Sequence, residues 1–255
     1  MGKGPGTPDD QFENELEVFR TEAEGATLFF YAYLAVHAAA AAHKSVLQLL
    51  DQSALFWNTN LAALQTAAFI VLGRIFDQNS PHNLDRLLRI AQDNPRIFSK
   101  VALGRRRQGN NPEPPPWLAE FLRDAYEPTP KDFRRIRAHV RKWRRIYESK
   151  YRDLRHKVFA HKVADHDQTA ALFGKVNIRE LQRMFAFLNS LYEALWQSFV
   201  NGRRLVLRPL RYSVKRMRAL PSPGKGRSAT QEHITHEVEE FLISASRVAN
   251  AAPGR

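Results

Sequence analysis

Apolar residues recur every three or four positions through most of the chain, which is the spacing of one face of an α-helix. The clearest run lies in residues 131–162, where the apolar positions are Phe133, Ile136, Val140, Trp143, Tyr147, Tyr151, Leu154 and Val158. The positions beside this apolar stripe are strongly basic and include Arg134, Arg135, Arg137, Arg141, Arg144 and Arg145. Thr129-Pro130 has the form of a capped helix start. The pattern therefore predicts one long amphipathic helix over this range.

Further helices are expected at residues 9–50, 53–77, 117–125, 177–201 and 230–249. In the first of them, Gly25 marks the candidate position for a break. Ser80-Pro81 has the form of an N-cap and first helical residue, which predicts a short helix after it. Asn177 is placed to cap the helix that follows. Because no alternating apolar pattern is long enough for a sheet, the sequence predicts an all-α fold.

Glycine and proline mark the expected boundaries between the parts of the chain. The run GRRRQGNNPEPPP predicts a loop over residues 104–116. Pro209 argues against a continuous helix through the basic stretch Arg203–Arg218. The predicted organisation is a disordered tail over residues 1–8, a helical bundle over residues 9–202, a basic linker over residues 203–228 and a C-terminal helix over residues 229–250.

Composition narrows the classes of function. The chain has 255 residues and no cysteine, which excludes disulfides, thiolate metal sites and a cysteine nucleophile. Its formal net charge of +13 favours contact with polyanions, nucleic acid before anionic membrane. The first residues, MGKGPGTPDD, lack the apolar core of a signal peptide. We expect a cytoplasmic protein.

Two uncharged stretches, residues 26–42 and 53–73, raise the question of a membrane hairpin. The second stretch contains Asn58, Asn60 and Gln65, which are unfavourable in lipid. We expect both stretches to form a pair of buried helices in a soluble protein, with no membrane insertion.

Candidate chemistry lies in the segment YRDLRHKVFAHK, residues 151–162. Five residues separate Arg155 from His161, and His156 follows the arginine directly. An arginine can hold a phosphate and a histidine can move a proton near neutral pH. These residues alone leave a plainer alternative open, in which the histidine is a buried structural residue and the arginine is merely solvated.

The segment LRHKVFAH resembles the Arg-x(4–6)-His motif of the HEPN superfamily, in the AbiU-type branch associated with bacterial abortive infection. FWNTNLAALQTAAFIVLGRIFD, residues 56–77, resembles the central helix of that branch. The resemblance implies an antiparallel multi-helix bundle with long helices, here followed by a basic C-terminal extension. It also implies a metal-independent endoribonuclease without a cofactor, acting as a toxin or antiviral effector, with an antitoxin as a possible partner.

By the same resemblance, Arg155 would hold the scissile phosphate and His161 would act as general acid or base. His156 stands where the family often has Asn or Asp, and it could donate a hydrogen bond there. On a straight helix, Arg155 and His161 would point about 120° apart. Either the helix bends or a second copy completes the site, and we favour a homodimer. The residues expected to contact RNA are Arg144, Arg145, Arg152, Lys157, Lys162, Arg203 and Arg204.

Other interpretations stay open. A non-catalytic nucleic-acid-binding or partner-binding helical module would keep the same bundle and the same charge. The histidines at 156, 161 and 166 lack the ligand spacing typical of zinc, and His233 and His236 are expected on a solvated helix face. Arg74 and Asp77 are placed to form an ion pair within one helix.

Overall fold

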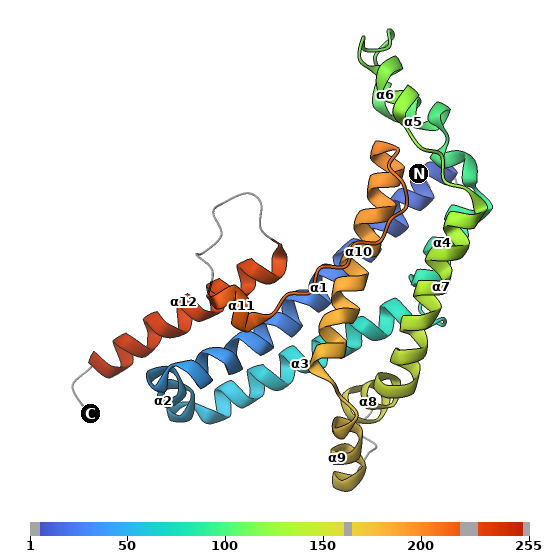
Figure 1. Cartoon of the computed structure of the whole chain (residues 1–255). Helices are drawn as coiled ribbons and strands as arrows, with labels where there is room; N and C mark the ends of the chain where they lie inside the picture. The colour runs from blue at the N-terminus through green and yellow to red at the C-terminus, as the bar shows by residue number, and fades with distance from the viewer. Residues whose placement is uncertain (1–5, 161–164, 220–228, 252–255) are drawn as a thin grey trace, which may run out of the picture. The chain divides into compact units, whose positions relative to one another are not determined.

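The computed structural model describes residues 6–160, 165–219 and 229–251. Throughout these residues the regular structure is helical and no β-strand occurs, which confirms the all-α bundle (Figure 1). Two predicted site residues, His161 and Lys162, lie outside the described residues. The elements are α1 (Pro8–Ala42), α2 (Lys44–Gln52), α3 (Ala54–Phe76), α4 (Leu84–Asp93), the 3₁₀ turn η1 (Pro95–Phe98), α5 (Lys100–Gln108), α6 (Leu118–Asp124), α7 (Pro130–Ile146), the π-helical η2 (Tyr147–Tyr151), α8 (Arg152–Leu154), the π-helical η3 (Arg155–Ala160), α9 (His166–Gly174), α10 (Ile178–Asn201), α11 (Val214–Arg218) and α12 (Thr230–Ala251).

The chain forms two compact units, each assembled from segments distant in sequence. Unit 1 comprises Met1–Glu22, Arg74–Arg152 and Ala186–Leu210. Unit 2 comprises Ala23–Gly73, Asp153–Phe185 and Arg211–Arg255. The helices α1, α3 and α10 each contribute residues to both units.

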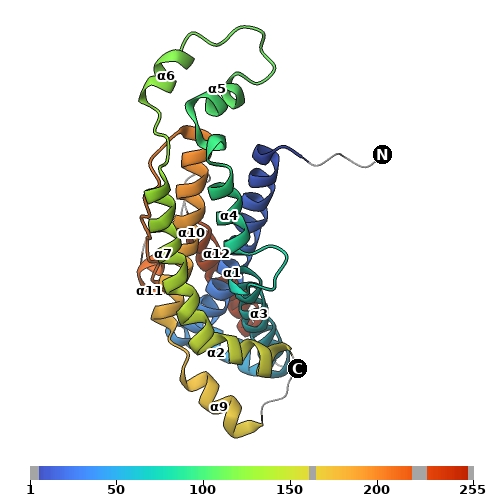
Figure 2. The same cartoon turned by 90° about the vertical axis from the view of Figure 1, so that its right-hand side faces the viewer.

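Unit 1 is built on aromatic packing. The Phe12 ring lies 5.1 Å from that of Phe98 and 5.0 Å from that of Phe199, between ring centroids. Trp143 of α7 stacks on Phe187 of α10 at 5.7 Å, so these two helices lie side by side (Figures 1 and 2). Each such ring pair stabilises the fold by about 0.5–1.5 kcal/mol in addition to the contribution of the apolar area that it buries.

The start of α7 confirms the predicted cap. Thr129 accepts a hydrogen bond from the backbone N–H of Asp132, the Asp132 carboxylate accepts one from the Thr129 backbone, and Pro130 takes the first turn. Burial disfavours the Asp132 carboxylate, but hydrogen bonds from Thr129 and from the Tyr126 hydroxyl hold its pKa below the usual value. The first turn of α7 is therefore firmly fixed.

The predicted loop 104–116 is wrong at its beginning, because Gly104–Gln108 belong to α5. Ser99 caps this helix by accepting from the Ala102 N–H. Arg106 then makes an ion pair with Asp9 and donates to the Phe199 carbonyl oxygen at 2.8 Å. These tertiary contacts favour helix in a segment whose composition alone suggested a loop.

Two helix boundaries also differ from the prediction. The helix α4 is capped by Asn83, which accepts from the Arg86 N–H at 3.0 Å, rather than by Ser80-Pro81. In unit 2, α1 passes through Gly25 without a break and ends just before His43. The predicted cap at Asn177 is confirmed, since its side chain accepts from the Glu180 N–H at 3.1 Å.

Unit 2 joins α1 and α2 to the C-terminal helices. Val36 and Ala39 of α1, Val46 of α2 and Leu242 of α12 form a buried apolar cluster. Beside it, the Arg218 Nε donates to Glu239 at 2.7 Å and Arg218 also donates to the Ala38 carbonyl oxygen. The helices α11 and α12 are therefore part of the packed structure of this unit.

Among the described residues, α1 and α3 are long and apolar enough to cross a membrane by length and composition alone. Within their most apolar windows, 44% and 39% of the residues are buried inside the protein. Length and composition are equally typical of core helices in soluble proteins.

Candidate functional site

Arg155 of η3 lies directly against the backbone of α3 in unit 2. A Cβ atom built at Gly73 would collide with the Nε and Cδ of Arg155 and lie 2.7 Å from its Cζ. Real Cβ atoms essentially never approach another heavy atom below 3.0 Å. Only glycine at position 73 leaves room for the Arg155 side chain in this position.

The guanidinium of Arg155 also contacts its neighbour in sequence, with 3.1 Å between its Nη1 and the Nε2 of His156. Arginine has no hydrogen-bond acceptor, so it donates and His156 Nε2 accepts. A hydrogen bond of this kind leaves the Nδ1 of the imidazole to carry the ring proton. The sequence suggested that His156 donates a hydrogen bond, whereas at this nitrogen it accepts one from Arg155.

The segment that carries Arg155 is not a straight α-helix. The residues Arg155–Ala160 form the π-helical η3, a rare conformation that is frequent at functional sites. Phe159 fixes it by stacking on Phe69 of α3 at 5.2 Å and by an edge contact with Phe173 of α9 at 5.9 Å. The expected separation of 120° between Arg155 and His161 assumed a straight α-helix. Because Arg155–Ala160 are π-helical, that expected angle does not apply.

The residues predicted to contact RNA differ in their exposure. Arg144 is buried and pairs with Asp85 at 2.7 Å in unit 1, which does not fit an RNA contact. Lys157 is exposed and pairs with Asp153 at 3.1 Å. The other exposed members of the predicted set are Arg145, Arg152, Arg203 and Arg204.

Comparison with known proteins identifies the family whose motif the segment around Arg155 resembles. The HEPN family described as AbiU2 matches residues 9–215 of the chain, which include both Arg155 and Gly73. The chain belongs to the AbiU2 family of HEPN proteins. No curated protein and no solved structure matches it. The family places this chain among abortive-infection-related HEPN domains.

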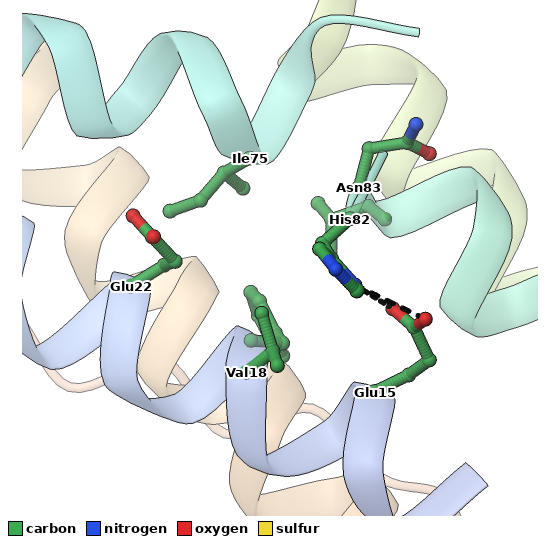
Figure 3. Close-up of a pocket in the computed structure, with 8 residues that line it drawn as sticks. Glu15, Val18, Glu22, Ile75, His82 and Asn83 are labelled. Carbon is green, nitrogen blue, oxygen red and sulfur yellow. Dashed lines mark hydrogen bonds and ion pairs between the residues drawn. The ribbon is translucent and has the colours of Figure 1, made fainter. Parts of the chain in front are cut away.

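A small hollow in unit 1 of this HEPN protein is a rival site (Figure 3). Its polar residues are Glu15, Glu22, His82 and Asn83. The buried Glu15 carboxylate faces the Nδ1 of His82 at 3.1 Å (Figure 3). It also pairs with Arg86 at 2.6 Å. A cavity of about 10 Å³ holds about one water molecule, so this hollow is too small for a nucleotide.

The structure corrects two expectations about residues outside this segment. Arg74 pairs with Glu22 at 2.8 Å and not with Asp77, so the predicted pair within one helix is wrong. His236 is buried on α12, which corrects the expectation of a solvated face at that position. Among the described residues, no three histidine or acidic side chains lie close enough together to hold a metal ion.

Gly73 is the site residue that sequence reasoning missed. Glycine within a helix destabilises it by about 0.5–1 kcal/mol relative to alanine, so a glycine inside the apolar helix α3 indicates a packing or functional requirement. The sequence carried that signal, but it could not show that the missing Cβ leaves room for Arg155, which lies more than eighty residues away in the chain.

Proposed function

We propose that this HEPN protein is a metal-independent endoribonuclease. The observation that carries the proposal is the guanidinium of Arg155, which is held against Gly73 and His156 within the motif segment of the family. A guanidinium fixed in this way suits bidentate contact with a phosphate and stabilisation of the charge that builds up during its attack.

The proposed reaction is an internal transfer at one phosphate of RNA. A base removes the proton from the ribose 2′-hydroxyl, and that oxygen attacks the phosphorus. The bond from phosphorus to the 5′-oxygen breaks, and an acid gives the leaving oxygen a proton. The products are a 2′,3′-cyclic phosphate and a 5′-hydroxyl, and no water is consumed. His161 supplies the proton transfers, Arg155 binds the phosphate, and His156 orients Arg155.

Substitution of the two reacting residues tests the proposal. The parent protein should cleave labelled RNA in excess EDTA, and Arg155→Ala or His161→Ala should lower cleavage at least 100-fold, because each removes a group that acts in the transition state. Arg123→Ala on α6 and His233→Ala on α12 serve as matched controls that should cleave normally. Normal cleavage by His161→Ala would refute the assignment.

The site is proposed to be completed across a homodimer. Mixing the Arg155→Ala and His161→Ala proteins tests this directly. In a mixed dimer, one site combines the intact arginine of one subunit with the intact histidine of the other, and the second site has neither residue. Random exchange should restore about a quarter of the parent activity, since half of the dimers are mixed and each has one intact site. A mixture as inactive as its components would show that both residues come from one chain.

In the cell, the proposed role is a cytoplasmic toxin or antiviral effector that an antitoxin restrains. Expression of the parent should arrest growth, while His161→Ala should be tolerated. Fractionation should place the protein in the soluble fraction, as expected if α1 and α3 are core helices. Recovery in the membrane fraction after a carbonate wash would overturn that assignment.

A second candidate is a nucleic-acid-binding module without turnover. The exposed cations of α7, Arg203 and Arg204 favour it. It predicts salt-dependent RNA binding with no cleavage products, even at high protein concentration and long incubation.

A further inference from the structure

One side of α7 in unit 1 carries a continuous set of cations. We name it the basic face, and it consists of Lys131, Arg134, Arg135, Ala138, Arg141, Lys142 and Arg145. At 100° per residue these positions fall within about 120° of the helix circumference. All seven residues are exposed, including the alanine, so no other part of unit 1 covers this side of the helix.

The charge of the basic face is almost uncompensated. Arg135 pairs with Asp132 at 3.3 Å. The other five cations make no ion pair with any residue that the structure describes. Because like charges held this close repel one another, the face favours binding to a polyanion. By contrast, the buried Arg144 on the opposite side of α7 is neutralised by Asp85.

The segment after α10 adds three exposed cations to unit 1. The Arg135 guanidinium donates to the Leu205 carbonyl oxygen at 2.8 Å, and the Arg208 N–H donates to the Ser190 hydroxyl of α10 at 2.6 Å. These bonds fasten the segment along the helices of unit 1. Its exposed basic residues are Arg203, Arg204 and Arg208.

The basic face offers no aromatic surface on which a base could stack. At the C-terminal end of the face, Trp143 stacks on Phe187 and Tyr147 is buried against Phe76. Before its N-terminal end, the Tyr126 hydroxyl donates to Asp132 and the Tyr126 ring is covered by the Arg204 guanidinium at 4.9 Å. Proteins that bind single-stranded nucleic acid combine cations with aromatic side chains that stack on the bases. A cationic surface without aromatic side chains instead suits a duplex, whose phosphates are exposed and whose bases are not.

The dimensions agree with one side of a duplex. The fourteen steps from Lys131 to Arg145 span about 21 Å of helix. A duplex carries about one charge per 1.7 Å, so this length holds roughly twelve phosphates, of which about six face one side. The basic face has six cations over the same length.

We propose that the basic face of α7 binds the phosphate backbone of a double-helical segment, so that the substrate is a folded RNA with a stem. The choice of RNA over DNA rests on the proposed ribonuclease function, whereas the choice of duplex over single strand rests on the basic face. Contact to phosphates alone fixes position without reading sequence. The protein therefore binds stems of different sequence with similar affinity.

Fluorescence anisotropy with a labelled RNA hairpin of twelve base pairs tests this proposal. The full chain carries His161→Ala so that the probe stays intact. Arg134, Arg141 and Arg145 are replaced together by Gln, which keeps hydrogen-bonding side chains and good helix formers. Six phosphate contacts give a slope of log affinity against log salt of about −5, and loss of three makes it less steep by about 2.7. Affinity near 0.1 M salt should fall at least tenfold.

A matched triple variant controls for net charge. It replaces three exposed arginines on other helices, Arg123, Arg179 and Arg247, by Gln. This variant should bind the hairpin within twofold of the parent. Equal binding by the basic-face variant, or an equal loss in the control, would overturn the proposal.

Other probes separate the competing partners. Single-stranded RNA of the same length should bind more weakly than the hairpin, and tighter binding would overturn the duplex assignment. If the basic-face substitutions abolish binding to vesicles with 30% anionic lipid but leave hairpin binding intact, the face is a membrane contact instead. Because the assay needs no turnover, loss of hairpin binding in a protein whose parent never cleaves RNA would support the basic face and refute the ribonuclease.

Discussion

Replacement of Gly73 by alanine tests whether the position of Arg155 matters for function. The new Cβ would lie 2.7 Å from Arg155 Cζ, whereas ordinary contact begins at 3.4 Å, so the guanidinium must retreat by at least about 0.7 Å. A displacement of about 1 Å at a reacting group can cost about 100-fold in rate, which equals about 2.7 kcal/mol of activation free energy. We expect kcat for RNA cleavage to fall by that order.

Gly25→Ala is the matched control, because no atom lies within 4 Å of a Cβ at that position of α1. It should raise the free energy of unfolding by about 0.5–1 kcal/mol, as glycine-to-alanine changes in helices do, and leave cleavage unchanged. Both variants are compared by urea unfolding and by single-turnover cleavage. The reasoning fails if Gly73→Ala cleaves as fast as the parent while Arg155→Ala does not cleave.

Two further predictions concern stability. Arg144→Ala removes one partner of a buried ion pair and should lower the free energy of unfolding, measured in urea, by about 3 kcal/mol. Arg145→Ala, at the exposed neighbouring position, should change it by less than about 0.5 kcal/mol. Equal effects would contradict the structural role of Arg144. Burial disfavours the charged Glu239 carboxylate, but hydrogen bonds from Arg218 and His43 hold its pKa below the usual value. The stability that this carboxylate contributes is therefore present above about pH 4.3 and is lost as the pH falls through the lowered pKa. Arg218→Met should therefore cost about 2–3 kcal/mol at pH 7 and progressively less below about pH 4, and a cost independent of pH would contradict this.

Sequence reasoning succeeded where a short stretch of chain decides the outcome. Thr129-Pro130 and Asn177 were predicted as helix starts because a cap depends on residues within one turn. It failed at Ser80-Pro81 because Asn83, three residues later, is an equally good cap and is the one used. Gly104–Gln108 form helix through contacts of Arg106 with distant segments, which local composition does not reveal.

The candidate site was predicted in part. Arg155 was identified from the spacing of the motif, and the family match is consistent with that choice. Its contact with Gly73 and its donation to His156 depend on the packing of η3 on α3. No sequence rule indicated the π-helical conformation of η3 either, because it depends on how Phe159 packs between Phe69 and Phe173.

The most direct test of the central claim is mass spectrometry of the ends that purified protein leaves on a defined RNA in excess EDTA. The account predicts 2′,3′-cyclic phosphate and 5′-hydroxyl ends from the parent, and no such products from Arg155→Ala or His161→Ala at equal concentration. Intact RNA with the parent protein, 5′-phosphate ends, or the same products from either variant would contradict it.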